Sequence, residues 1–92
     1  MIVGLLQLDL HVPEAGSLKS KRFVVKSLKD RLRKKFNVSV AEDANDLWQR
    51  VSFYVATVSN DTRVVNSTLE GVKNMIEKEP LVELLGYSME ID

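Results

Sequence analysis

The sequence predicts one α+β domain in which strands and helices follow in the order β-α-β-β-α-β. Residues 2–12 alternate between strongly apolar and mixed positions, which is typical of a strand with one buried face. Two later segments repeat apolar residues at helical spacing, and β-branched and aromatic residues are frequent between and after them. A chain of 92 residues suits one domain, 1–92, and is too short for two.

The first strand is expected to end at Pro13, which cannot donate a backbone hydrogen bond to a neighbouring strand. Its strongly apolar side consists of Ile2, Leu6, Leu8, Leu10 and Val12. Its other side consists of Val3, Leu5, Gln7, Asp9 and His11. The alternation therefore predicts that only one face of the sheet is covered.

A helix is predicted from about residue 18 to residue 36. Ser17 before it is a good N-cap, and Leu18, Val25, Leu28, Leu32 and Phe36 follow at helical spacing. Asn37 is expected to end the helix, because Asn tolerates the left-handed conformation that is common there.

A hairpin and a second helix are predicted next. The hairpin joins a short strand over 38–41 to a second strand over 48–58 through the polar connector 42–46. The segment 59–61 is expected to cap the second helix, whose apolar positions are Val65, Leu69, Val72 and Ile76. This helix is expected to end before Pro80. A final strand should place Leu85, Tyr87, Met89 and Ile91 on one side.

This order matches the split βαβ, or ferredoxin-like, arrangement of a four-stranded antiparallel sheet with two helices on one face. The predicted core is one cluster drawn from two strands and both helices. It consists of Leu6, Leu8, Leu10, Val25, Leu28, Leu32, Phe53, Val55, Val65, Leu69, Val72 and Ile76. Because many unrelated activities use this fold, function has to be argued from particular sites.

Composition excludes several classes of site. The chain has no cysteine, so disulfides, thiolate nucleophiles and cysteine metal sites are absent. No basic residue precedes the first apolar run and no apolar stretch approaches 18 residues, so neither a secretory signal nor a membrane span is expected. We therefore expect a cytoplasmic protein without cofactor or metal. The acidic connector 42–46 lacks the spacing of a calcium loop.

The net charge of zero conceals an asymmetry between the two halves of the chain. Residues 1–40 contain nine Lys and Arg and three Asp and Glu, whereas residues 41–92 contain four and ten. On the first predicted helix, Lys19, Arg22, Lys26, Lys29 and Arg33 fall within one narrow sector beside the apolar stripe. Such a row of like charges repels itself, and a phosphate backbone along the helix would relieve the repulsion.

We therefore predict that this helix binds RNA or a ribosomal particle, with Lys26 and Lys29 largely exposed. A solvated surface, or an acidic surface of another protein, is the alternative explanation for the basic row.

The open face of the sheet is a second candidate surface. It is expected to present Val3, Leu5, Trp48, Arg50 and Tyr54, a mixed apolar set that favours burial against a second copy of the chain. The same face of an RNA-recognition motif carries base-stacking aromatics, but the run 50–57 lacks two of them and the first strand has none. Base stacking on this face is therefore not expected. No aromatic platform accompanies the basic row of the first helix, so its RNA contacts should go mainly to phosphates.

Several segments together resemble the YlxP-like family of small bacterial proteins. They are Ser17–Arg22, Val25–Leu28, Asp30–Leu32, Phe36–Glu42, Asp46–Arg50 and Val58–Asp61, and the resemblance covers essentially the whole chain. It implies a ferredoxin-like fold in a bacterial cytoplasmic protein. It implies no catalytic residues, because the family is classed as a domain of unknown function. Its members are often encoded near genes for translation initiation and ribosome maturation, which favours the ribosome hypothesis.

Two alternative functions remain open. The chain could be a homodimeric interaction module whose basic helix meets an acidic protein. A small phosphoester or acyl-phosphate enzyme is the weaker alternative: acylphosphatases share the fold, and Gly16 and Arg22 are the nearest equivalents of their phosphate loop. The segment 13–16 lacks that family's Gly-rich pattern, and no small-molecule substrate is identified.

Overall fold

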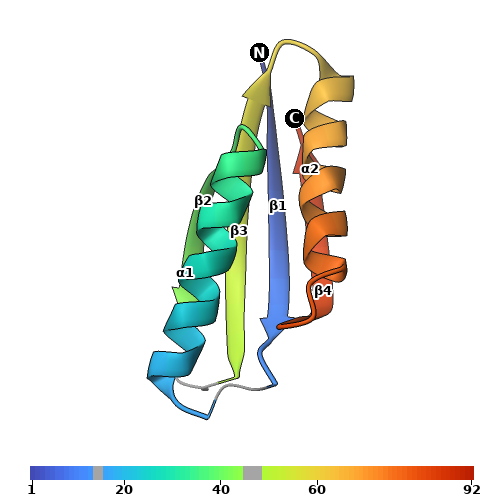
Figure 1. The fold of residues 1–92 in the computed structure, drawn as a ribbon. Coiled ribbons are helices and arrows are strands. Elements are labelled where there is room, and N and C mark those ends of the chain that lie inside the picture. The colour runs from blue at the N-terminus through green and yellow to red at the C-terminus, as the bar shows by residue number, and fades with distance from the viewer. Residues whose placement is uncertain (14–15, 45–48) are drawn as a thin grey trace.

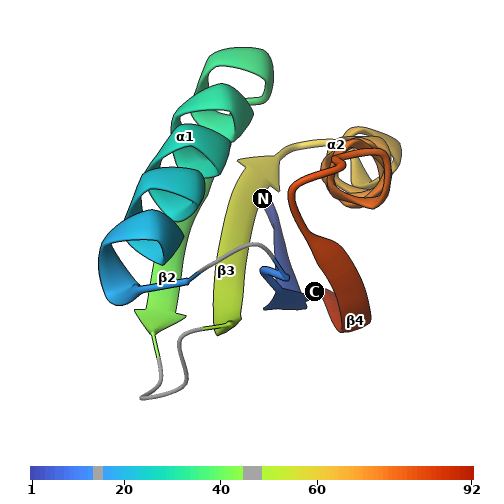
Figure 2. The ribbon, with the colours of Figure 1, turned by 60° about the horizontal axis from the view of Figure 1, so that its bottom comes forward.

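The computed structural model describes residues 1–13, 16–44 and 49–92. Its elements are β1 (Ile2–His11), α1 (Leu18–Lys35), β2 (Ser39–Ala44), β3 (Arg50–Ser59), α2 (Thr62–Glu77) and β4 (Glu83–Ile91). The strands form one antiparallel sheet in the order β2-β3-β1-β4 (Figure 1). Both helices lie on the same face of this sheet, as Figure 2 shows. The predicted ferredoxin-like α+β fold is therefore confirmed.

The core lies between the sheet and the two helices. Leu6, Leu8 and Leu10 of β1 face the helices and are fully buried, because the strand alternation directs every second side chain inward. Every residue predicted for the core is buried, and the cluster also includes Val12, Val40, Val51 and Val82. Of the residues described, none forms a helix that is long and apolar enough to cross a membrane.

The two helices begin as predicted, but α1 ends differently. The Ser17 hydroxyl accepts a hydrogen bond from the Ser20 N–H, and the Asp61 carboxylate accepts one from the Arg63 N–H. The prediction of a left-handed Asn37 is wrong: α1 ends at Phe36 in an extended conformation, and no described non-glycine residue has a positive φ. The Phe36 ring packs on the core beside Gly71, where an added Cβ would lie 2.8 Å from ring atom Cε1. The Val38 N–H then donates to the Phe36 carbonyl at 3.0 Å, so the chain turns at Asn37 before it enters β2.

Two of the predicted strands also differ from the structure. β2 continues to Ala44, so Glu42 and Asp43 lie in the strand rather than in the connector. In β4 the register shifts, so that Leu84 lies opposite Leu10 and Gly86 lies opposite Asp9. Leu85 is skipped by this bulge and remains 49% exposed, instead of sharing the inward side with Met89 and Ile91.

Candidate nucleic-acid interface

The sheet-facing side of α1 determines which of its cations can reach a partner. Val25, Leu28 and Leu32 are buried against the sheet, so the opposite side of the helix faces solvent. Figure 1 shows α1 over β2 and β3, with α2 on the other half of the sheet. The row of cations predicted from the sequence therefore lies at the outer edge of the molecule, beside β2.

The first half of this row is exposed. Lys19, Arg22 and Lys26 all have exposed side chains. In the part of the chain that the structure describes, no ion pair involves any of the three. The first turn of α1 contains no acidic residue, so the positive end of the helix dipole adds to their charge instead of being neutralised. This end of α1 is therefore an uncompensated cationic surface.

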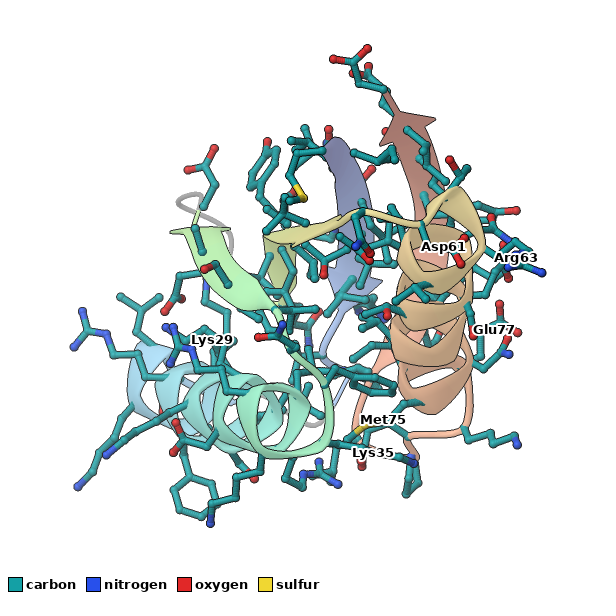
Figure 3. The ribbon with its side chains drawn as sticks, turned by 90° about the horizontal axis from the view of Figure 1, so that it is seen from above. Lys29, Lys35, Asp61, Arg63, Met75 and Glu77 are labelled. Atoms are coloured by element: carbon teal, nitrogen blue, oxygen red, sulfur yellow. The ribbon has the colours of Figure 1, made fainter. Side chains whose placement is uncertain are left out.

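The second half of the row is compensated within the molecule. Lys29 Nζ binds Glu42 Oε1 at 2.5 Å, and only 18% of the Lys29 side chain is exposed. Arg33 donates to the Val40 carbonyl at 2.8 Å and lies 3.9 Å from Asp30. Figure 3 labels Lys29 on the side of α1 next to β2. The prediction that Lys29 is largely exposed is wrong, because β2 is longer than predicted and brings Glu42 beside it.

Lys21 lies on the core side of α1 and is the one charged residue among the described residues that is buried, at 2% exposure. Its Nζ donates a hydrogen bond to the Arg50 carbonyl at 3.2 Å. This contact joins the start of α1 to the start of β3. Lys21 therefore supports the position of the basic helix and does not belong to its outer surface.

Phe23 is a feature of α1 that the sequence interpretation missed. It is 75% exposed on the solvent side of the helix, between Lys19 and Lys26. Because it stands two residues before buried Val25, it is turned by about 160° from that core position, a separation that helical spacing alone could have revealed. The inference that no aromatic accompanies the basic row is therefore wrong.

The open face of the sheet has the predicted apolar residues at one end. Val3 and Leu5 are 51% and 41% exposed, and Val58, which pairs with Val3, is 51% exposed. Tyr54 is half-buried and Arg50 is exposed. Val58 was not predicted for this face, and Trp48 lies outside the described residues.

The other end of the open face is polar. Asp9 Oδ1 accepts hydrogen bonds from Ser52 Oγ at 2.8 Å and from Gln7 Nε2 at 3.3 Å. His11 Nδ1 lies 3.6 Å from Glu83 Oε1. Within the described residues, no three His, Asp or Glu side chains are placed to hold a metal ion. The face therefore divides into an apolar half and a hydrogen-bonded half.

Comparison with known proteins identifies both sequence relatives and structural neighbours. The chain is 37% identical over 83 residues to the uncharacterized protein YlxP of Bacillus subtilis, covering 89% of this chain and 90% of YlxP. The structured domain of Drosophila melanogaster Boca matches with a TM-score of 0.61 at 10% identity, covering 94% of this chain and 95% of that one.

A structural-genomics protein, YJCS, matches with a TM-score of 0.62 at 10% identity, covering 96% of each chain. At such identities these two structures share the fold and nothing further. Residues 3–89 match the model of a family described as a protein of unknown function, DUF503, and with the YlxP match this shows that the chain belongs to that family of small bacterial proteins.

Proposed function

We propose that the protein is a non-catalytic factor that binds the phosphate backbone of RNA, on ribosomal particles, through the first half of α1. The observation that carries this proposal is the uncompensated cationic surface formed by Lys19, Arg22 and Lys26. A chain with no net charge has no general attraction for polyanions, so binding has to depend on such a local concentration of charge.

The contrast between the two halves of α1 supports this assignment. Lys29 and Arg33 bind acceptors on β2 and stabilise the fold, whereas the three earlier cations have no described acceptor. The positions of Lys19 and Lys26 span about 10 Å along the helix axis, which is long enough to meet two or three phosphates. Release of about three counterions from single-stranded RNA gives a slope of log affinity against log salt of about −2.

A salt series on ribosomal particles and on RNA oligonucleotides tests the proposal. Co-sedimentation should weaken as salt rises, and replacing Lys19, Arg22 and Lys26 together by Gln should remove most of the slope. Lys29→Gln is the matched control: Glu42 already compensates that ammonium group, so its loss should change the slope by much less than one unit. A triple variant that binds as tightly as the wild type, with the same slope, would assign α1 to a protein partner instead.

Self-association through the open sheet face is a second candidate function, supported by the exposed Val3, Leu5 and Val58. The four strands contain 10, 6, 10 and 9 residues, so at about 3.3 Å per residue and about 4.8 Å between strands the face covers roughly 550 Å². Two such faces would bury about 1,100 Å², which is below the standard range and sufficient for a weak dimer. A dimer should be seen by sedimentation velocity at high micromolar concentration, and Tyr54→Glu should dissociate it. A monomer at that concentration would contradict this candidate.

A further inference from the structure

Phe23 is exposed where nothing in the fold requires an aromatic residue. Its ring is 75% exposed, whereas Val25, Leu28 and Leu32 supply the core contacts of α1. In the described part of the chain, neither of the two cation–π contacts involves it: these join Lys35 to Phe36 and Lys73 to Tyr87. Phe23 therefore contributes little to folding, and its side chain is accessible to a partner from solution.

The surroundings of Phe23 favour a nucleic acid as its partner. Lys19 precedes it by four residues and Lys26 follows it by three, so both are its neighbours on the helix surface. Arg22 is adjacent in sequence, and all three cations are exposed. A ring flanked by cations suits a base attached to phosphates, because the base stacks on the ring while the phosphates on either side meet the lysines.

A membrane surface fits this site less well. A helix that binds a bilayer interface buries a continuous apolar face, but that face of α1 is already covered by the sheet. A protein interface of standard size would need more apolar surface than Phe23 and the half-exposed Leu18 provide.

We propose that Phe23 is a stacking platform for one unpaired RNA base, with Lys19 and Lys26 holding the flanking phosphates. This inference rests on the proposed function and adds the form of RNA that is bound. Bases in a duplex are already stacked on their neighbours and cannot cover an external ring. The site therefore selects single-stranded segments, such as loops, bulges or ends, over duplex RNA.

The test measures binding of the full chain to a fluorescein-labelled 12-nucleotide single-stranded oligo(A) and to a 12-base-pair RNA duplex by anisotropy. Phe23→Leu keeps an apolar side chain without an aromatic face. It should weaken single-strand binding about 5- to 140-fold, the equivalent of one stacked base, with an unchanged salt slope and unchanged duplex binding. Phe23→Trp should bind as tightly as the wild type or more tightly.

A spectroscopic signature and a matched control complete the design. The fluorescence of 2-aminopurine placed in the single strand should be quenched by the wild type and by Phe23→Trp, and not by Phe23→Leu. Tyr87→Leu removes another exposed aromatic, on β4 at the far edge of the sheet, and should leave RNA binding unchanged. Circular dichroism should show that all these variants are folded.

The outcomes separate this inference from the proposed function. Single-strand binding that is salt-dependent but equal in the wild type and Phe23→Leu would overturn the stacking role and keep the phosphate role of α1. If Phe23→Leu weakens binding to the single strand and to the duplex equally, the stacking role is also overturned. Absence of wild-type binding to both probes would overturn the inference and the direct RNA contact together. If Phe23→Leu loses binding to phosphatidylglycerol vesicles while its RNA binding stays unchanged, the stacking role is overturned and the ring is assigned to a membrane surface.

Discussion

Gly4 lies on β1 where Val65 and Leu69 of α2 pack tightly against it, and replacing it by Ala tests this packing. An added Cβ would overlap Val65 Cγ1 and lie 2.8 Å from Leu69 Cδ1, and both of these α2 side chains are fully buried. Val65 is β-branched and cannot rotate freely within a helix, so α2 or β1 has to shift. Overpacking of this kind costs about 1–3 kcal/mol.

A smaller effect of the same substitution opposes this cost. Ala lowers the conformational entropy of the unfolded chain relative to Gly. Where the native backbone conformation is compatible with Ala, as it is at Gly4, this raises the free energy of unfolding by about 0.4–1 kcal/mol. The expected net loss in the free energy of unfolding is about 1–2 kcal/mol, or a fall in Tm of roughly 4–16 °C. Urea denaturation followed by circular dichroism measures it, and an unchanged m-value would show that the compactness of neither state has changed.

Gly86 provides the matched control. It lies in β4 and, like Gly4, has no positive φ, but an added Cβ would meet no atom within 4 Å. Gly86→Ala should therefore be neutral or slightly stabilising. Combining Gly4→Ala with Val65→Ala removes the overlapping methyl group, so the double variant should be more stable than the sum of the single effects by at least about 0.5 kcal/mol. A Gly4→Ala variant as stable as Gly86→Ala would refute the close approach of α2 to β1.

Three further predictions concern the core, a helix cap and an ion pair. Leu28→Ala should cost about 2–5 kcal/mol in urea denaturation, because Leu28 is fully buried between α1 and the sheet. Hydrogen bonds from the Arg63 side chain and backbone N–H hold the pKa of Asp61 below its ordinary value, so its stabilising effect is complete above about pH 4 and is lost as the pH falls through the lowered pKa. Asp61→Ala should therefore lower Tm at pH 7 and progressively less in acid, whereas Asp61→Asn should retain the cap. Arg31→Gln should cost about 1–3 kcal/mol and reduce the salt dependence of stability, because it leaves the largely buried Glu79 carboxylate without the guanidinium 2.7 Å away.

The sequence predicted the fold well where periodicity and caps agreed. The alternation in β1 identified Leu6, Leu8 and Leu10 as core residues, and all three are buried. Ser17 and the segment 59–61 are predicted helix starts because their side chains can accept from the first turn, and Ser17 and Asp61 do so. At these positions the capping ability of single side chains and the periodicity of the apolar residues predict the same secondary structure.

The errors arose where contacts distant in the sequence decide the structure. Phe36 is extended and its ring packs beside Gly71 of α2, which no local propensity of Asn37 reveals. The bulge at Leu85 depends on how β4 meets β1, and strict alternation cannot anticipate it. Lys29 differs from Lys26 because Glu42 of β2 lies beside it. Phe23 was missed for another reason: the exposed side of the helix was searched for charge and not for aromatic residues.

Because β1 lies between β3 and β4, the sheet cannot be completed until β4 has been synthesised. Leu8 pairs with Phe53 on one side and with Tyr87 on the other, 45 and 79 residues later in the chain. At about 5–20 residues per second, β1 leaves the ribosome roughly 4–16 s before the strand that completes its pairing. During this interval one edge of β1 and the surface of α2 that contacts β4 are uncovered. Contacts between residues close in the sequence cannot replace this pairing. A nascent chain stalled before Glu83 should therefore be cleaved by protease at sites that become protected only once β4 has joined the sheet.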